Sequence, residues 1–197
     1  MSSPNPVVVY LHGFNSSPDS RKAQVLRQWA KVYRPGLQIE VPALPYSPKA
    51  AAELLGRLVE SLGSRLKGCI GSSLGGYYAT WLASRYEVPA ALVNPAVRPY
   101  ELLTDYLGEN TNLYTGERYR LTERHMQELI DLDVTEIARP ELFFLLIQTG
   151  DETLDCRQAA SKFVQARGWI EGGGNHEFTG FERTLPAIFE FFACSGK

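Results

Sequence analysis

The chain has 197 residues, a length that suits one domain with a sizeable hydrophobic core. Hydrophobic residues make up 44% of it and charged residues 21%, values typical of a globular protein, and the formal net charge is −2. The lack of a basic stripe or an acidic tail argues against nucleic acid and against a strongly charged partner. No window reaches the roughly 18 apolar residues of a membrane span, and the start of the chain has no signal-peptide pattern.

The three cysteines, Cys69, Cys156 and Cys194, are odd in number and lack metal-ligand spacing. They argue against a disulfide framework, and we expect a reducing, cytoplasmic setting.

Apolar patterns along the chain predict alternating strands and helices. The run Val-Val-Val-Tyr-Leu at 7–11 predicts a strand buried on both faces. Helical spacing follows at 25–32 and stops before Pro35, and a second helix is expected after the capping residue Ser47. Further strands are expected at 39–44, 67–70, 90–93, 142–147 and 168–171, with helices at 77–82 and 185–192. The order predicts an α/β fold of about six mostly parallel strands, with helices on both faces, in one domain over 1–197.

The segment 98–139, between the fourth and fifth expected strands, is longer than one crossover helix needs. We expect it to form a small helical cap over the strand ends, with a helix at 121–132; two ordinary packing helices are the alternative. Its candidates for lining a substrate pocket, or equally for packing the cap, are Tyr100, Tyr106, Leu107, Tyr114 and Tyr119. Arg98 and Arg120 could contact an anionic substrate tail, although exposed arginines are commonly only solvated.

The stretch Gly71-Ser72-Ser73-Leu74-Gly75 is the strongest chemical motif. It lies between an expected strand and an expected helix, the context of a nucleophile elbow. A serine in such a turn presents its oxygen at the end of a sheet, and flanking glycines remove side chains that would clash. The spacing predicts that Ser73 is the nucleophile.

A serine nucleophile needs a base and an acid that orients the base. Of the three histidines, His176 follows the last expected strand in a glycine-rich loop, whereas His12 is expected to brace its loop and His125 to lie in the cap. Asp151 follows the fifth strand. Asp155 is the alternative acid, but Asp-Cys-Arg-Gln from that position resembles a helix cap. Asp131 and Asp133 are more remote alternatives. The order Ser73, Asp151, His176 is that of α/β-hydrolases.

An oxyanion formed during acyl transfer needs backbone donors. The residue after the nucleophile, Leu74, is expected to supply one N–H group. We assign the second to Phe14, because Gly13 lets the loop after the first strand turn towards the site.

Taken together, these motifs make the chain resemble the α/β-hydrolase superfamily and, within it, the YqiA-like family of small bacterial esterases. The stretches that carry the resemblance are Tyr10–Pro18, Gly71–Gly76, Asn94–Ala96, Gln148–Glu152 and Gly173–His176, which span nearly the whole chain. The resemblance implies a compact α/β-hydrolase fold and esterase or thioesterase activity on acyl esters, including acyl-CoA as a candidate. It implies the same nucleophile, acid and base.

The expected function is therefore cleavage of a small-molecule acyl ester or thioester through an acyl-enzyme, with no metal or organic cofactor. An amidase or peptidase would use the same three residues, and a non-catalytic binding protein on the same scaffold is the other alternative.

Overall fold

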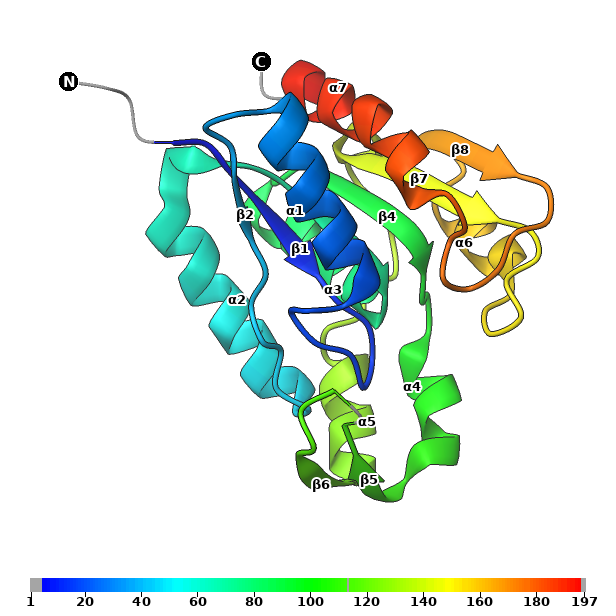
Figure 1. The fold of residues 1–197 in the computed structure, drawn as a ribbon. Helices are drawn as coiled ribbons and strands as arrows, with labels where there is room; N and C mark the ends of the chain where they lie inside the picture. Colours follow the sequence, from blue (N-terminus) through cyan, green and yellow to red (C-terminus); the bar gives the residue numbers. More distant parts are fainter. Residues whose placement is uncertain (1–4, 113, 196–197) are drawn as a thin grey trace.

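The structure, a computed structural model, describes residues 5–112 and 114–195. Its central sheet has the strand order β2-β1-β3-β4-β7-β8, and all neighbouring strands are parallel (Figure 1). The strands are β1 (Val7–Leu11), β2 (Gln38–Glu40), β3 (Leu66–Ser73), β4 (Ala90–Pro95), β7 (Phe143–Gln148) and β8 (Arg167–Glu171). The predicted α/β fold with six parallel strands is thus confirmed.

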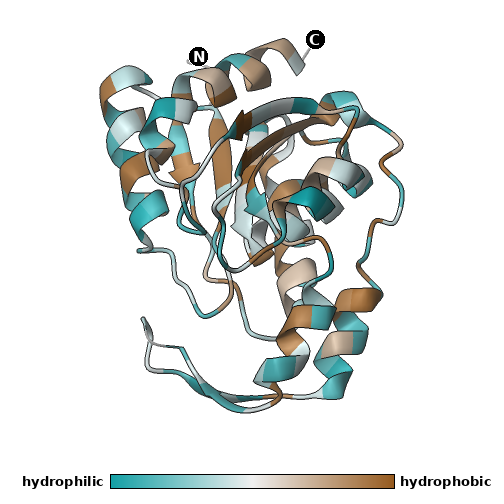
Figure 2. Ribbon diagram, turned by 90° about the vertical axis from the view of Figure 1, so that its right-hand side faces the viewer, coloured by the Kyte–Doolittle hydropathy of each residue, from teal (hydrophilic) through white to brown (hydrophobic). Residues whose placement is uncertain are grey.

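Side chains of the strands alternate between two hydrophobic cores, one on each face of the sheet. In β1, Val7, Val9 and Leu11 enter one core, and Val8 and Tyr10 enter the other. All five are buried, which explains the uninterrupted apolar run in the sequence. Figure 2 shows the strands of the central sheet largely in brown, between helices of mixed hydropathy.

Helices cover both faces of the sheet. The core on one face is closed by α1 (Arg21–Tyr33) and α7 (Leu185–Ser195), which follows the short helix η4 (Phe181–Thr184). The other face is covered by α2 (Pro48–Leu62), which leads into η1 (Gly63–Arg65), and by α3 (Leu74–Tyr86) and α6 (Cys156–Lys162). As expected, Ser47 caps α2, because its Oγ accepts a hydrogen bond from Ala50 N at 3.3 Å. None of the helices in the described ranges is long and apolar enough to cross a membrane.

The segment 98–139 contains more than helices. It consists of α4 (Pro99–Leu102), η2 (Leu103–Tyr106), the strands β5 (Gly108–Thr111) and β6 (Arg118–Leu121), and α5 (Glu123–Ile130), and η3 (Pro140–Leu142) follows it. The helix expected at 121–132 is α5. The antiparallel β5–β6 hairpin was not predicted, because its short strands are mostly polar and appear largely teal in Figure 2. Figure 1 places the segment beyond the end of β1.

Candidate active site

Ser73 ends β3 in a sharp turn, and α3 begins at the next residue, Leu74. The φ angle of Ser73 is +56°, in the left-handed region that residues with a side chain rarely adopt. A strained serine between a strand and a helix is the geometry of a nucleophile elbow. The strand–turn–helix context expected from the sequence is therefore present.

Two glycines of the motif allow this turn to pack closely. A Cβ atom at Gly75 would lie 2.0 Å from the carbonyl oxygen of Leu11, and one at Gly71 would lie 2.2 Å from the carbonyl oxygen of Gly75. Relieving these overlaps with backbone oxygens would require β1, β3 or the start of α3 to move. The glycines therefore let α3 begin directly against the end of β1.

The structure brings together the three side chains that the sequence singled out. Nε2 of His176 lies 3.1 Å from Oγ of Ser73, and Nδ1 of His176 lies 2.8 Å from Oδ2 of Asp151. An ionised carboxylate only accepts hydrogen bonds, so Nδ1 carries the ring proton and donates it. Nε2 is then free to accept the hydrogen of the Ser73 hydroxyl.

Asp151 is held in its ionised form. Burial of its side chain, which is 2% exposed, opposes ionisation. Hydrogen bonds from His176 and from the backbone N–H groups of Leu154 and Thr153 outweigh burial and hold the pKa of Asp151 below its ordinary value. A carboxylate fixed in this way can orient the imidazole and stabilise its protonated form.

Two buried amide side chains, which were not predicted as functional, hold the loop that carries His176. Asn94, at the end of β4, donates from Nδ2 to the carbonyl oxygens of Asn175 and His176 at 3.0 and 3.2 Å. Oε1 of Gln148, at the end of β7, accepts from the backbone N–H groups of Asn175 and Thr179. Both residues are 2% exposed. The signal that could have found them is a polar residue at the end of an apolar strand.

The loop after β1 is fixed beside Ser73. His12 is buried; its Nδ1 donates to the carbonyl oxygen of Gly13 at 3.0 Å, and its Nε2 accepts from Leu44 N at 3.3 Å. Burial lowers the pKa of His12, which favours this neutral form. A Cβ atom at Gly13 would lie 3.3 Å from Cβ of Ser73. The loop thus passes directly over Ser73, with His12 bracing it.

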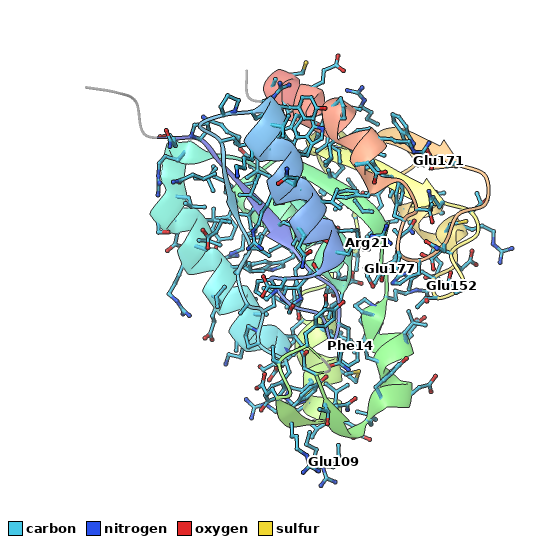
Figure 3. The ribbon with its side chains drawn as sticks, in the orientation of Figure 1. Phe14, Arg21, Glu109, Glu152, Glu171 and Glu177 are labelled. Atoms are coloured by element: carbon cyan, nitrogen blue, oxygen red, sulfur yellow. The ribbon has the colours of Figure 1, made fainter. Side chains whose placement is uncertain are left out.

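A cavity of about 270 Å³ lies over the site, and Ser73, His176, Leu74 and Phe14 are part of its wall. One side is apolar and comes mainly from α4 and η2: Phe14, Pro99, Leu102, Leu103 and Tyr106. The other side is polar and comes mainly from the start of α1 and the loop before it: Ser16, Ser20, Arg21 and Lys22, with Glu177 beside them. In Figure 3, Arg21 and Glu177 lie towards α1, and Phe14 lies towards α4 and the hairpin.

The five candidate pocket residues take different positions. Tyr106 and Tyr114 line the cavity. Tyr100 instead donates to Oδ2 of Asp133 at 3.2 Å, Tyr119 is buried against the loop after β1, and Leu107 is 38% exposed. These last three are not among the residues that form the cavity wall.

The remaining candidates lie elsewhere. Asp155 caps α6 by accepting from Arg157 N at 3.0 Å, as its sequence context predicted. Oδ1 of Asp131 accepts from Gln127, and Oδ1 of Asp133 accepts from Lys162.

Neither Arg98 nor Arg120 reaches the cavity wall. Arg98 pairs with Glu101, and Arg120 pairs with Glu109. His125 caps α5 with Thr122.

Solved structures share this fold over nearly the whole chain. Alpha/beta hydrolase domain-containing protein 10 from mouse matches with a TM-score of 0.69 at 16% identity, covering 100% of this chain and 93% of the mouse chain. The esterase domain of a Rhodothermus marinus protein has a TM-score of 0.67 at 17% identity and covers 99% and 88% of the two chains. Est1E from Butyrivibrio proteoclasticus has a TM-score of 0.68 at 15% identity and covers 97% and 88%. At these identities the likeness establishes the fold.

The chain also matches a protein family over a range that includes all the strands of the central sheet and the loops that follow them. The profile of the uncharacterised protein family UPF0227 matches residues 7–193, from the start of β1 into α7. The matched range includes Ser73, Asp151 and His176. The chain therefore belongs to family UPF0227, the YqiA-like family that its motifs resemble, and has the fold of an α/β-hydrolase.

Proposed function

We propose that the protein is a serine hydrolase that cleaves carboxylic esters or thioesters through an acyl-enzyme. The observation that carries the proposal is the unbroken chain of hydrogen bonds from the Ser73 hydroxyl through His176 to Asp151, of which Ser73 and His176 line a cavity. These residues have the geometry that a nucleophile, a base and an orienting acid require.

In the first half of the reaction, Ser73 Oγ attacks the substrate carbonyl while His176 Nε2 takes the hydroxyl proton. Asp151 holds the imidazole in the required tautomer and stabilises the imidazolium. The protonated His176 then gives its proton to the leaving alcohol or thiol. In the second half, water activated by His176 cleaves the acyl-enzyme and restores Ser73.

The backbone N–H groups of Phe14 and Leu74 are the donors that we assign to the oxyanion. Both residues line the cavity beside Ser73, which supports the assignment. Donors that are fixed before the reaction stabilise the developing charge without reorganising, and losing one typically slows acyl transfer by about 10²–10³-fold.

The segment 98–139 serves in this proposal as a cap on a single hydrolase domain. Its residues Leu102, Leu103 and Tyr106 supply much of the apolar side of the cavity, which suits an acyl chain. Likeness to the Rhodothermus marinus esterase domain supports an ester as the substrate class.

The test is hydrolysis of p-nitrophenyl esters of graded acyl length by the wild type and by Ser73→Ala. The variant should lose at least about 10³-fold in kcat while keeping its far-UV and near-UV circular dichroism. The control is Ser64→Ala, which changes an exposed serine in η1 and should retain wild-type turnover. Full activity in Ser73→Ala would contradict the proposal, and faster turnover of matched anilides than of esters would favour an amidase.

A further inference from the structure

His176 is carried by a loop, residues 172–180, that contains no helix or strand. The loop connects β8 to η4, and its backbone has positive φ angles at Gly173, Gly174 and Phe178. Such a backbone lacks the repeating hydrogen bonds of regular structure and depends on other parts of the chain for partners. The position of the His176 imidazole therefore depends on the side chains that bind this loop.

Three of these side chains approach the loop from β4 and β7. Asn94 and Gln148, at the ends of these strands, bind backbone groups of the loop. Oε2 of Glu152, in the segment after β7, accepts a hydrogen bond from His176 N at 3.0 Å. Together they hold the loop against one part of the sheet and leave its other side, towards α1, to a different residue.

Lys22, the second residue of α1, holds the loop on that side. Its Nζ donates to the carbonyl oxygen of Glu177 at 3.0 Å and to Oε2 of the same residue at 2.9 Å. Glu177 directly follows His176, although it lies 155 positions after Lys22 in the sequence. Figure 3 shows Glu177 towards α1 and Glu152 farther from that helix. The backbone is thus bound on both sides of His176.

The exposures of the two side chains argue against stability as the reason for this lysine. The side chain of Lys22 is 10% exposed, whereas that of Glu177 is 70% exposed. Burying an ammonium group is costly, and an ion pair with a largely exposed carboxylate returns little stability. A buried apolar side chain of similar size would avoid that cost. What the lysine supplies, and an apolar residue would not, is a pair of N–H donors to Glu177.

The reaction tolerates only a narrow range of positions for the imidazole. Nε2 of His176 lies 3.1 Å from Oγ of Ser73, and displacement of a catalytic group by about 1 Å can slow a reaction about 10²-fold. Asp151 fixes the ring through Nδ1, but the backbone of His176 sets where the side chain starts. A contact that holds the next carbonyl oxygen therefore bears on proton transfer from Ser73.

We propose that Lys22 is a positioning residue: it holds Glu177 against α1 and thereby keeps His176 Nε2 within reach of Ser73 Oγ. This inference rests on the proposed function. Because Lys22 acts through the backbone of the loop, its loss lowers kcat and leaves KM unchanged. Lys22 also forms part of the cavity wall, so contact with the substrate is the alternative role that the test must separate.

The kinetic test uses Lys22→Met, which keeps a long apolar side chain at this position and removes the N–H donors. With a p-nitrophenyl ester that the wild type cleaves, kcat should fall about 10- to 100-fold while KM stays within twofold. The matched control is Lys31→Met, which removes an exposed cation from the last turn of the same helix and should keep both constants.

Two kinetic results would overturn the inference. The first is an unchanged kcat per folded molecule in Lys22→Met, even if the free energy of unfolding falls, because the role of Lys22 would then be structural only. The second is a rise in KM larger than the fall in kcat, which would assign Lys22 to substrate binding. Near-UV circular dichroism checks the fold of each variant. If Lys22→Met does not fold, Lys22→Gln is held to the same criteria.

A second measurement reads the imidazole directly and needs no turnover. With ¹⁵N-labelled histidine, NMR detects the ring nitrogens of the three histidines, His12, His125 and His176. Lys22→Met should change the Nδ1 and Nε2 shifts of His176 and leave those of the other two histidines in place. Lys31→Met should leave all three unchanged. Unchanged His176 shifts in Lys22→Met would overturn the inference.

The two measurements also separate failure of this inference from failure of the proposed function. If ester hydrolysis depends on Ser73 and Lys22→Met matches the wild type, the inference alone fails. Hydrolysis that does not depend on Ser73 would instead contradict the proposed function. The histidine spectra would then still decide whether Lys22 positions His176.

Discussion

The hydroxyl of Tyr119 donates a hydrogen bond to Oδ1 of Asn15 and thereby ties the β5–β6 hairpin to the loop after β1. Asn15 has a φ of +51° and directly follows Phe14, the residue assigned as an oxyanion donor. The ring of Tyr46 stacks on Tyr119 with 4.7 Å between the ring centroids. Asn112, beside the hairpin, supports the same loop by donating to the carbonyl oxygen of Ser16 at 3.0 Å.

Tyr119→Phe should slow the reaction without weakening substrate binding. The change removes the hydroxyl that holds Asn15 but keeps the ring, so the Phe14 N–H group would be less well fixed. Burial raises the pKa of Tyr119 to about 12, so its hydroxyl remains a donor at neutral pH. We expect kcat to fall about three- to tenfold with KM within twofold, as for loss of one hydrogen bond. Tyr46→Phe is the control and should leave kcat unchanged; equal kcat in Tyr119→Phe and the wild type would contradict the positioning role.

Gly75→Ala should damage both stability and activity. The added Cβ would lie 2.0 Å from the Leu11 carbonyl oxygen, so β1 and the start of α3 must separate. We expect the free energy of unfolding, measured by urea denaturation, to fall by about 1–3 kcal/mol. We also expect the variant to lose most of its ester hydrolysis. Gly168→Ala in β8, where nothing lies within 4 Å of the added atom, should stay within about 0.5 kcal/mol of the wild type. Equal stability of the two variants would show that the close approach is unimportant.

Asp151 should make a pH-dependent contribution to stability. Its pKa is lowered in the folded state, so the unfolded chain binds more protons around pH 4, the ordinary range of Asp. The contribution is therefore present above the unfolded pKa and is lost as pH falls through the folded pKa. Asp151→Asn should lower the free energy of unfolding more at neutral pH than at acidic pH. Ser73→Ala leaves both Asp151 and His176 in place, so its free energy of unfolding should differ from that of the wild type by the same amount at every pH. A difference between Asp151→Asn and the wild type that does not change with pH would refute the prediction.

Strong local patterns made the sheet and the arrangement of polar residues predictable from the sequence. The run at 7–11 is buried on both faces, and the motif around Ser73 needs glycines for steric reasons that are visible in the sequence. Because the strands are parallel, residues that follow them gather at one edge, so the sequence order could indicate that Asp151 and His176 approach Ser73.

Features that depend on long-range contacts were not predictable. The β5–β6 hairpin has no apolar run, and it is held through Tyr119 and Asn112, whose partners lie about a hundred positions away. Tyr119 was a candidate either for lining a substrate pocket or for packing the cap, and neither expectation included the hydrogen bond from its hydroxyl to the loop after β1. The start of α1, with Ser20 and Arg21, was not expected near the site, and only the fold brings it to the cavity.

Covalent labelling by a fluorophosphonate tests the proposed role of Ser73 most directly. We expect one phosphonylated site in the wild type, with fragment ions that assign the adduct to Ser73 rather than to Ser72. Labelling should disappear in Ser73→Ala and become much slower in His176→Ala, because the hydroxyl then lacks its base. An adduct on a different serine, or equal labelling rates in the wild type and His176→Ala, would contradict the proposed role of Ser73.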